Sequence, residues 1–115
     1  MATVSAHVLS GLDGTHVGGL DVSLVNLTSG RSLFRTKTDS HGRLSEVVDL
    51  HDADPGDRYE LVFHTLSYWR SVGINTDNCI QEIVLRFLAP DSEARYHRPV
   101  ILSPHSYSAW ASLPE

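Results

Sequence analysis

The stretch RYHRPVILSPHSYSAW, residues 95–110, reads as a β-strand followed by a turn, because residues 100–102 form an apolar, strand-forming run. The start of this strand carries His97, Arg98 and Pro99, a combination that is uncommon in a fully paired strand. Proline has no N–H to donate, so Pro99 predicts an edge, a bulge or an interruption of pairing. Arg98 shares a face with Val100 and Leu102. If these two residues face the core, the Arg98 side chain must extend to the edge of the core or pair with another group.

The rest of the chain shows the same period of two. In TVSAHVL, residues 3–9, the side chains of Val4, Ala6 and Val8 point one way and that of His7 the other. Segments of this kind, separated by turn residues, give about eight short strands, which is typical of a β-sandwich. Further segments of this kind begin at residues 20, 32, 44, 58, 79 and 105. The segment LSYWRSVG predicts one short helix with Gly73 as its C-cap, and Gly42 suits a tight turn with positive φ.

Length and composition favour one globular domain spanning residues 1–115. The chain is 41% hydrophobic and 20% charged, which supports a folded core. Its net charge of −5 argues against nucleic acids and anionic membranes as partners. The single cysteine, Cys79, cannot form an internal disulfide, and the first residues do not resemble a signal peptide. We therefore expect a cytoplasmic protein, with the peroxisome left open.

Two histidines and one arginine are the candidates for chemistry. His7 and His97 lie in strands and point away from the apolar partners of those strands, and imidazole is the usual acid or base near neutral pH. Arg43 follows the turn at Gly42, where a guanidinium can hold an anion or an oxyanion. Taken singly, each of the three is also explained as a solvated surface residue.

Other catalytic groups find little support in the pattern. The seven histidines do not show HxH or HxxxH spacing, so we expect no metal site and no cofactor. No serine lies in a GxSxG motif, so the pattern does not indicate a serine triad.

The chain nevertheless resembles a known family, the transthyretin-like proteins, and within them the 5-hydroxyisourate hydrolases. The resemblance rests on four stretches spread over nearly the whole chain: AHVLSGLDG, TKTDSHGRL, GDRYELVFHTLSYW and RYHRPVILSPHSYS. It implies an all-β fold, a transthyretin-like sandwich of two four-stranded sheets with one short helix. It also implies a homotetramer with its sites at the dimer–dimer interface, acting on a small molecule.

The same resemblance implies an activity and the residues that perform it. The family opens the ring of 5-hydroxyisourate, a cyclic amide of urate breakdown, without a metal. His7, Arg43 and His97 match its catalytic positions, and a histidine-assisted water attacks a ring carbonyl while the arginine holds the substrate. Contact with the substrate is assigned to Pro99, Ile101, Ser108 and Trp110.

The C-terminus departs from the family pattern, in which the hydrolases end in Tyr-Arg-Gly-Ser. Here the matching residues are Trp110, Ala111, Ser112 and Leu113, so the arginine is missing. Two alternatives therefore stay open. One is a relative repurposed for a different ring opening, rearrangement or cyclisation in a biosynthetic pathway. The other is a non-catalytic carrier of small ligands, which the three polar residues disfavour because each would cost desolvation.

Overall fold

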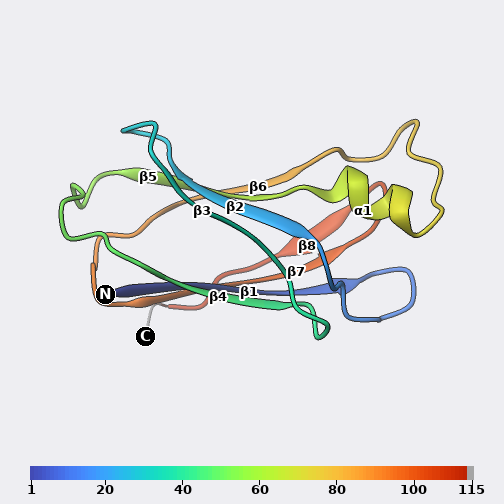
Figure 1. Ribbon diagram of the computed structural model, residues 1–115, viewed down its shortest axis with the longest axis horizontal. Helices are drawn as coiled ribbons and strands as arrows, with labels where there is room; N and C mark the ends of the chain where they lie inside the picture. Colours follow the sequence, from blue (N-terminus) through green and yellow to red (C-terminus); the bar gives the residue numbers. More distant parts are fainter. Residues whose placement is uncertain (114–115) are drawn as a thin grey trace.

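The alternating segments form two four-stranded sheets that pack face to face, with one short helix at the side (Figure 1). The computed structural model describes residues 1–113. Its elements are β1 (Ala2–Ser10), β2 (Asp21–Asn26), β3 (Ser32–Lys37), β4 (Arg43–Val48), β5 (Arg58–Phe63), α1 (Thr65–Ser71), β6 (Ile83–Leu88), β7 (Arg95–Leu102) and β8 (Tyr107–Ala109). The predicted sandwich of two four-stranded sheets with one short helix is confirmed.

One sheet has the strand order β4-β1-β7-β8 and the other β3-β2-β5-β6. Most neighbouring strands are antiparallel, but β1 and β7 run parallel over eight registered pairs, from Thr3 opposite Arg95 to Ser10 opposite Leu102. These two strands come from opposite ends of the chain and form the centre of the first sheet. Whatever lies on their outer face is therefore held by the most firmly paired part of that sheet.

The core lies between the sheets and takes every second residue of each central strand. In β1 the side chains of Val4, Ala6 and Val8 are buried, as predicted, while His7 points outward and is half-buried. In β7 the buried positions are Tyr96, Arg98, Val100 and Leu102. The intervening residues, His97 among them, therefore belong to the outer face.

Pro99 lies where the pairing between β7 and β8 ends. The last regular pair joins Val100 to Ala109, and beyond it the backbone N–H of Trp110 donates to the Pro99 carbonyl at 3.4 Å. A residue with an N–H at position 99 would donate a second hydrogen bond, to the carbonyl of Trp110, and would extend the pairing by one residue. Of the three explanations that the sequence left open, the structure agrees with interrupted pairing.

Arg98 finds its partners inside the sandwich. Its side chain is only 9% exposed, and its guanidinium carbon lies 4.6 Å from the centre of the Phe87 ring. One guanidinium nitrogen donates to the carbonyl of His97 at 3.0 Å. Burial lowers the pKa of Arg98, and within residues 1–113 no carboxylate forms an ion pair with it. The aromatic face therefore takes the place of a carboxylate.

Helix α1 follows β5 directly and is anchored to the core by Trp69, which is almost fully buried. The helix ends at Ser71, Val72 caps it, and Gly73 adopts φ +81°, in agreement with the predicted glycine stop. Among the described residues no helix has the length and apolar character needed to cross a bilayer.

The turn that leads into β4 and Arg43 depends on Gly42. Its φ is +71°, and an added Cβ would lie 2.3 Å from the backbone carbonyl oxygen of Val8. Replacing Gly42 with alanine should lower the free energy of unfolding by about 3 kcal/mol or more, through backbone strain together with a clash that no side-chain movement relieves. Urea denaturation followed by circular dichroism measures this.

The matched control is Gly30→Ala, because Gly30 has φ +78° but nothing within 4 Å of the added Cβ. Strain alone should cost this variant about 1 kcal/mol. Equal losses in the two variants would mean that the close approach to Val8 does not constrain the turn.

Candidate active site

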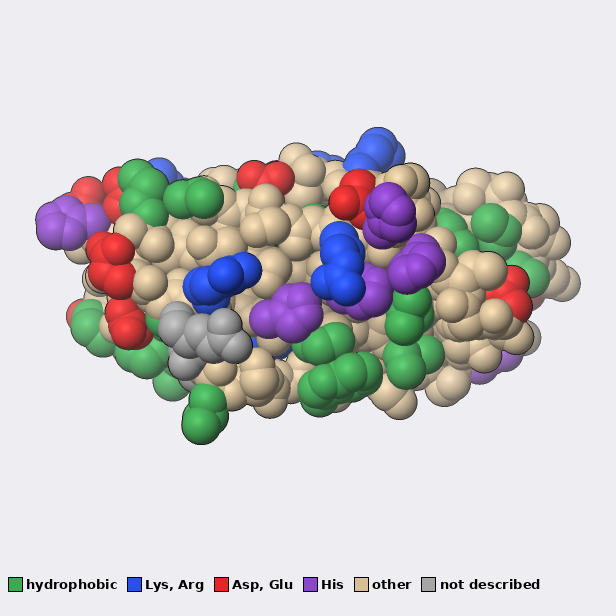
Figure 2. All heavy atoms as spheres, turned by 90° about the horizontal axis from the view of Figure 1, so that it is seen from below, with side chains coloured by type: hydrophobic (Ala, Val, Ile, Leu, Met, Phe, Trp, Pro, Cys, Tyr) green, Lys and Arg blue, Asp and Glu red, His purple; other side chains and the backbone are tan. Residues whose placement is uncertain are grey.

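The candidate catalytic residues lie on the outer face of three adjacent strands. His7 of β1 is paired directly with Arg43 of β4, and Ser5 of β1 is paired with His97 of β7. His7 and His97 are thus one diagonal step apart on the same face. Figure 2, which looks onto this sheet, shows histidine and arginine side chains gathered on one part of the surface. The fold therefore brings together three residues that are far apart in the sequence.

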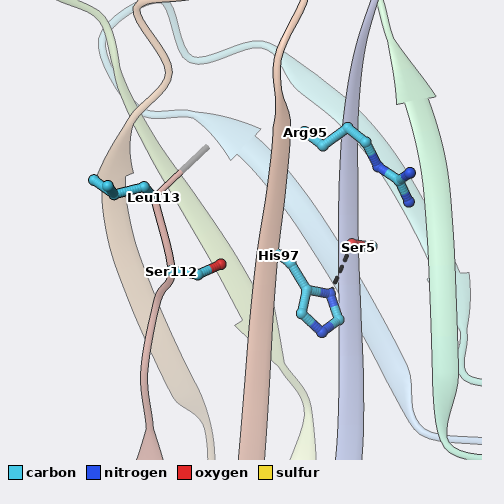
Figure 3. Close-up of a pocket in the computed structure, with 5 residues that line it drawn as sticks. All are labelled: Ser5, Arg95, His97, Ser112 and Leu113. Carbon is cyan, nitrogen blue, oxygen red and sulfur yellow. Dashed lines mark hydrogen bonds between the residues drawn. The ribbon is translucent and has the colours of Figure 1, made fainter. Parts of the chain in front are cut away.

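His97 is held by a serine of the neighbouring strand. Its Nδ1 atom is hydrogen-bonded to the hydroxyl of Ser5 at 2.8 Å, which fixes the orientation of the imidazole (Figure 3). Around it lies a pocket of about 240 Å³ lined by Ser5, Arg95, His97, Ser112 and Leu113. The segment after β8 thus reaches the histidine, and two of its residues form one wall.

A second pocket adjoins the first and contains both arginines. It has a volume of about 230 Å³, and its lining includes Asp39, Arg43, Arg95, His97 and Ser5. Ser5, Arg95 and His97 line both pockets, so the two are parts of one hollow on the sheet surface. Two guanidinium groups and one imidazole border this hollow, which makes it suited to a polar ligand rich in oxygen.

His7 is the first of a row of three histidines. Its Nε2 atom lies 3.3 Å from Nδ1 of His16, with the two rings stacked, and the ring of His41 meets His16 edge-on at 6.1 Å between centroids. Burial lowers the pKa of His7, and the charges of Arg43, His16 and His97 lower it further. His7 therefore stays neutral to a lower pH than an isolated histidine, as a base must.

The turn before β4 places Arg43 at the edge of this hollow. The Asp39 carboxylate accepts the backbone N–H groups of His41 at 2.8 Å and of Arg43 at 3.0 Å. These two bonds hold the pKa of Asp39 below its usual value. The carboxylate is thus committed to the backbone of the turn, and it fixes the point from which the Arg43 side chain extends.

The residues assigned to substrate contact divide into two groups. Pro99, Ile101 and Ser108 lie on the same face as His97, with Pro99 paired to His7 and Ile101 paired to Ser108. Trp110 is 52% exposed and lines another pocket, of about 310 Å³, together with Arg98 and Phe87. Trp110 is not among the residues that line the hollow beside His97. The roles of all four residues stay predictions.

The sequence pattern missed several residues of the site. Ser5, Arg95 and Ser112 line the hollow, while His16 and His41 form a row with His7. Arg95 had a signal, because it precedes His97 by two and must share its face. His16 had none, since the loop that carries it returns to β1 only through an isolated bridge to Leu9. Within the described part of the chain, no three side chains of histidine, cysteine, aspartate or glutamate are grouped so that they could hold a metal ion.

Comparisons with known proteins agree with this architecture. Residues 4–111 match the family described as HIUase/Transthyretin. The chain is 37% identical to 5-hydroxyisourate hydrolase 2 of Rhizobium meliloti, a match that covers 93% of this chain and 92% of that protein. It is 31% identical to 5-hydroxyisourate hydrolase of Pseudomonas aeruginosa, covering 96% and 90% of the two chains.

Two solved structures show the same fold. Klebsiella pneumoniae 5-hydroxyisourate hydrolase superimposes with a TM-score of 0.78 at 24% identity, covering 97% of this chain and 99% of that one. Sea bream transthyretin in complex with thyroxine superimposes with a TM-score of 0.77 at 22% identity, covering 95% and 93%. The resemblance predicted from four sequence stretches is confirmed, and the chain belongs to the HIUase/Transthyretin family.

Proposed function

We propose that this chain is a hydrolase that opens the ring of 5-hydroxyisourate. The curated relatives that match nearly its whole length carry that activity in their names. The observation that carries the proposal is the convergence of His7, Arg43 and His97 on the outer face of β4, β1 and β7. A protein that only carried apolar ligands would lose binding energy by desolvating these three polar groups.

The proposed reaction is the addition of water to a ring carbonyl followed by breakage of its C–N bond. One histidine takes a proton from the attacking water, and the released ring nitrogen gains a proton from the other. The lowered pKa of His7 favours it as the base. Arg43 faces the oxygen of the tetrahedral intermediate, where a fixed guanidinium stabilises developing negative charge. No metal or cofactor takes part in this scheme.

The substrate is proposed to lie in the hollow between His97 and Arg43. Pro99, Ile101 and Ser108 would contact the substrate farther along the same face of β7 and β8, and Trp110 of another subunit would contribute a wall. Arg95 supplies a second guanidinium at the rim, while the C-terminal segment has Ala111 where the related hydrolases have arginine. An oxygen-rich heterocycle would thus meet two arginines despite the altered ending.

The assembly is proposed to be a homotetramer with its sites at the dimer–dimer interface. In one chain the hollow lies open on the outer face of the sheet, so water reaches it freely. A second sheet facing the first would enclose the hollow and bring residues of another subunit, Trp110 among them, toward the histidines. We propose a cytoplasmic location and a single domain over residues 1–115.

A second candidate is a related enzyme that acts on a different small oxygenated heterocycle. The observation in its favour is the ending Trp110-Ala111-Ser112-Leu113, because the wall beside His97 is formed by Ser112 and the apolar Leu113 and has no guanidinium. The same three polar residues would serve that reaction.

Replacing His97 with alanine tests the function directly. Decay of freshly generated 5-hydroxyisourate, followed by ultraviolet absorbance, should be fast with the wild type. In His97→Ala it should fall by about 10²–10⁴-fold, because one partner of the proton transfers is gone. The control is His51→Ala, which should keep the wild-type rate. His51 is an exposed histidine in the loop that follows β4, at the end of that strand away from Arg43.

Equal rates in wild type and His97→Ala would contradict the proposed role of His97. A wild-type rate no faster than buffer would favour the second candidate, and the search would then turn to larger and less polar rings.

The pH dependence of kcat/KM tests the role of His7. Because the pKa of His7 is lowered from its ordinary 6.5, its neutral form persists below that pH, and the acid limb of the profile should have its midpoint below 6.5. Removing a neighbouring positive charge with His16→Asn should move this midpoint upward, since His16 contributes to the lowering. His51→Asn should leave it in place.

An unchanged midpoint in His16→Asn, or a wild-type midpoint above 6.5, would show that His7 is not the base.

The tetramer is tested by sedimentation velocity of wild type and Ile101→Glu. Ile101 is half-buried on the outer face of β7, where the proposed dimer–dimer contact lies. A carboxylate there should convert tetramers into dimers, because it places an unpaired charge in the interface. The control is Val72→Glu, at an exposed position after α1. A wild-type protein that sediments as a monomer would contradict the proposed assembly.

A further inference from the structure

The opposite sheet carries a second group of chemically competent side chains, formed by Ser23, His64 and Glu82. The hydroxyl of Ser23 lies 2.9 Å from Nε2 of His64, and Nδ1 of the same imidazole lies 3.3 Å from a carboxylate oxygen of Glu82. None of the three belongs to the hollow around His97. The sequence pattern did not indicate them, because 41 residues separate the serine from the histidine.

Strand pairing explains how the three residues meet. β2 is antiparallel to β5, and the N–H of His64 donates to the carbonyl of Asp21 at 2.9 Å, so the end of β5 lies beside the start of β2. β5 is also paired with β6 through Phe63 and Ile83, which places the preceding residue, Glu82, on the other side of His64. Ser23 alternates with the buried Val22 and therefore faces outward.

The atoms used are those of a nucleophile–base–orienter relay. In such a relay the serine hydroxyl bonds to one imidazole nitrogen, and the carboxylate bonds to the other, which sets the tautomer and stabilises the imidazolium that forms. Here Nε2 faces the hydroxyl and Nδ1 faces the carboxylate. The His64 side chain is 24% exposed and that of Glu82 54%, so the base is shielded but can be reached.

The surroundings offer a place for a ligand. The base and the carboxylate border a hollow of about 400 Å³ that is lined by His64, Leu66, Ser67, Arg70, Gln81 and Glu82. Ser23 is not among these lining residues and contacts His64 from the β2 side. On the other side of Ser23, Arg35 of β3 is its direct cross-strand partner and is exposed on the same face. A guanidinium beside a nucleophilic hydroxyl can stabilise an oxyanion.

We propose that Ser23, His64 and Glu82 form a second catalytic site, which transfers acyl groups from small carboxylic esters to water. The Ser23 oxygen attacks the ester carbonyl carbon while its proton moves to Nε2 of His64. The C–O bond to the alcohol breaks, and the alcohol leaves with that proton. Water then attacks the acyl-serine, again giving its proton to His64, and the carboxylic acid departs as Ser23 is regenerated. Arg35 faces the carbonyl oxygen in both steps.

The test uses p-nitrophenyl acetate as substrate and a fluorophosphonate as covalent probe, with the full-length protein. Wild type should hydrolyse the ester with saturation kinetics, and peptide mass spectrometry should find the probe on Ser23. Ser23→Ala should lower kcat/KM by about 100-fold or more and abolish labelling. Glu82→Gln should lower kcat by about tenfold with little change in KM, because it only orients the imidazole.

Two controls separate this site from its surroundings and from the first site. Ser32→Ala changes an exposed serine at the start of β3 that lines neither hollow and should keep full activity. His97→Ala should also hydrolyse the ester normally, so a failed hydroxyisourate assay and a failed ester assay are independent results.

Three outcomes would overturn the proposal. They are an ester rate in Ser23→Ala equal to that of wild type, a covalent probe attached elsewhere, or a wild type that neither turns over the ester nor accepts the probe. Each would mean that the three residues only join β2, β5 and β6 through hydrogen bonds. Circular dichroism checks that each variant is folded. Ser23→Ala should fold, because Ser23 is only half-buried and lies on the outer face of β2.

Discussion

The parallel pairing of β1 with β7 is the constraint on which the rest of the structure depends. It joins the two ends of the chain in one register, and side-chain alternation then decides every neighbouring role. A slip of β7 by one residue against β1 would bury His97 and expose Val100, and would separate His97 from His7. The same register therefore decides which side chains of β1 and β7 enter the core and which form the candidate site, so a change in register would alter both.

How much the sequence predicts depends on whether a feature is local. Alternation in β1 and β7 is visible in the letters, so the sandwich, its core positions and the outward direction of His7 and His97 could be predicted. The contact between His7 and His16 could not, because it depends on where a loop between two strands returns. The fate of Arg98 was also beyond the pattern, since only the packed structure supplies Phe87 as its partner. The relay of Ser23, His64 and Glu82 needs three strands to be aligned first.

The two sheets carry different electrostatic environments on their outer faces. On the first, the guanidinium groups of Arg43 and Arg95 border the hollow together with the carboxylate of Asp39, in a chain whose net charge is −5. Positive neighbours keep His7 neutral and attract an oxygen-rich ligand at the same time, so one arrangement serves both base strength and binding. On the second, His64 has a carboxylate neighbour instead, which orients its imidazole toward Ser23.

The altered C-terminus changes where the guanidinium groups near His97 are located. Ala111 leaves the C-terminal segment without a guanidinium, yet Arg95 borders the same pocket from β7, two residues before His97. The backbone of Arg95 is fixed by its pairing with Thr3, so binding through this residue costs side-chain rotamer entropy but does not require a terminal segment to be ordered. The Arg95 side chain also approaches the substrate from the opposite side of His97 to Leu113 (Figure 3). In the proposed reaction the polar edge of the substrate would face β4 and β1, and its other edge would meet one hydroxyl, of Ser112, and one apolar side chain, of Leu113. Such a distribution of polar and apolar contacts selects for orientation within the hollow, and it would admit a ring with one apolar edge more readily than a site closed by arginine.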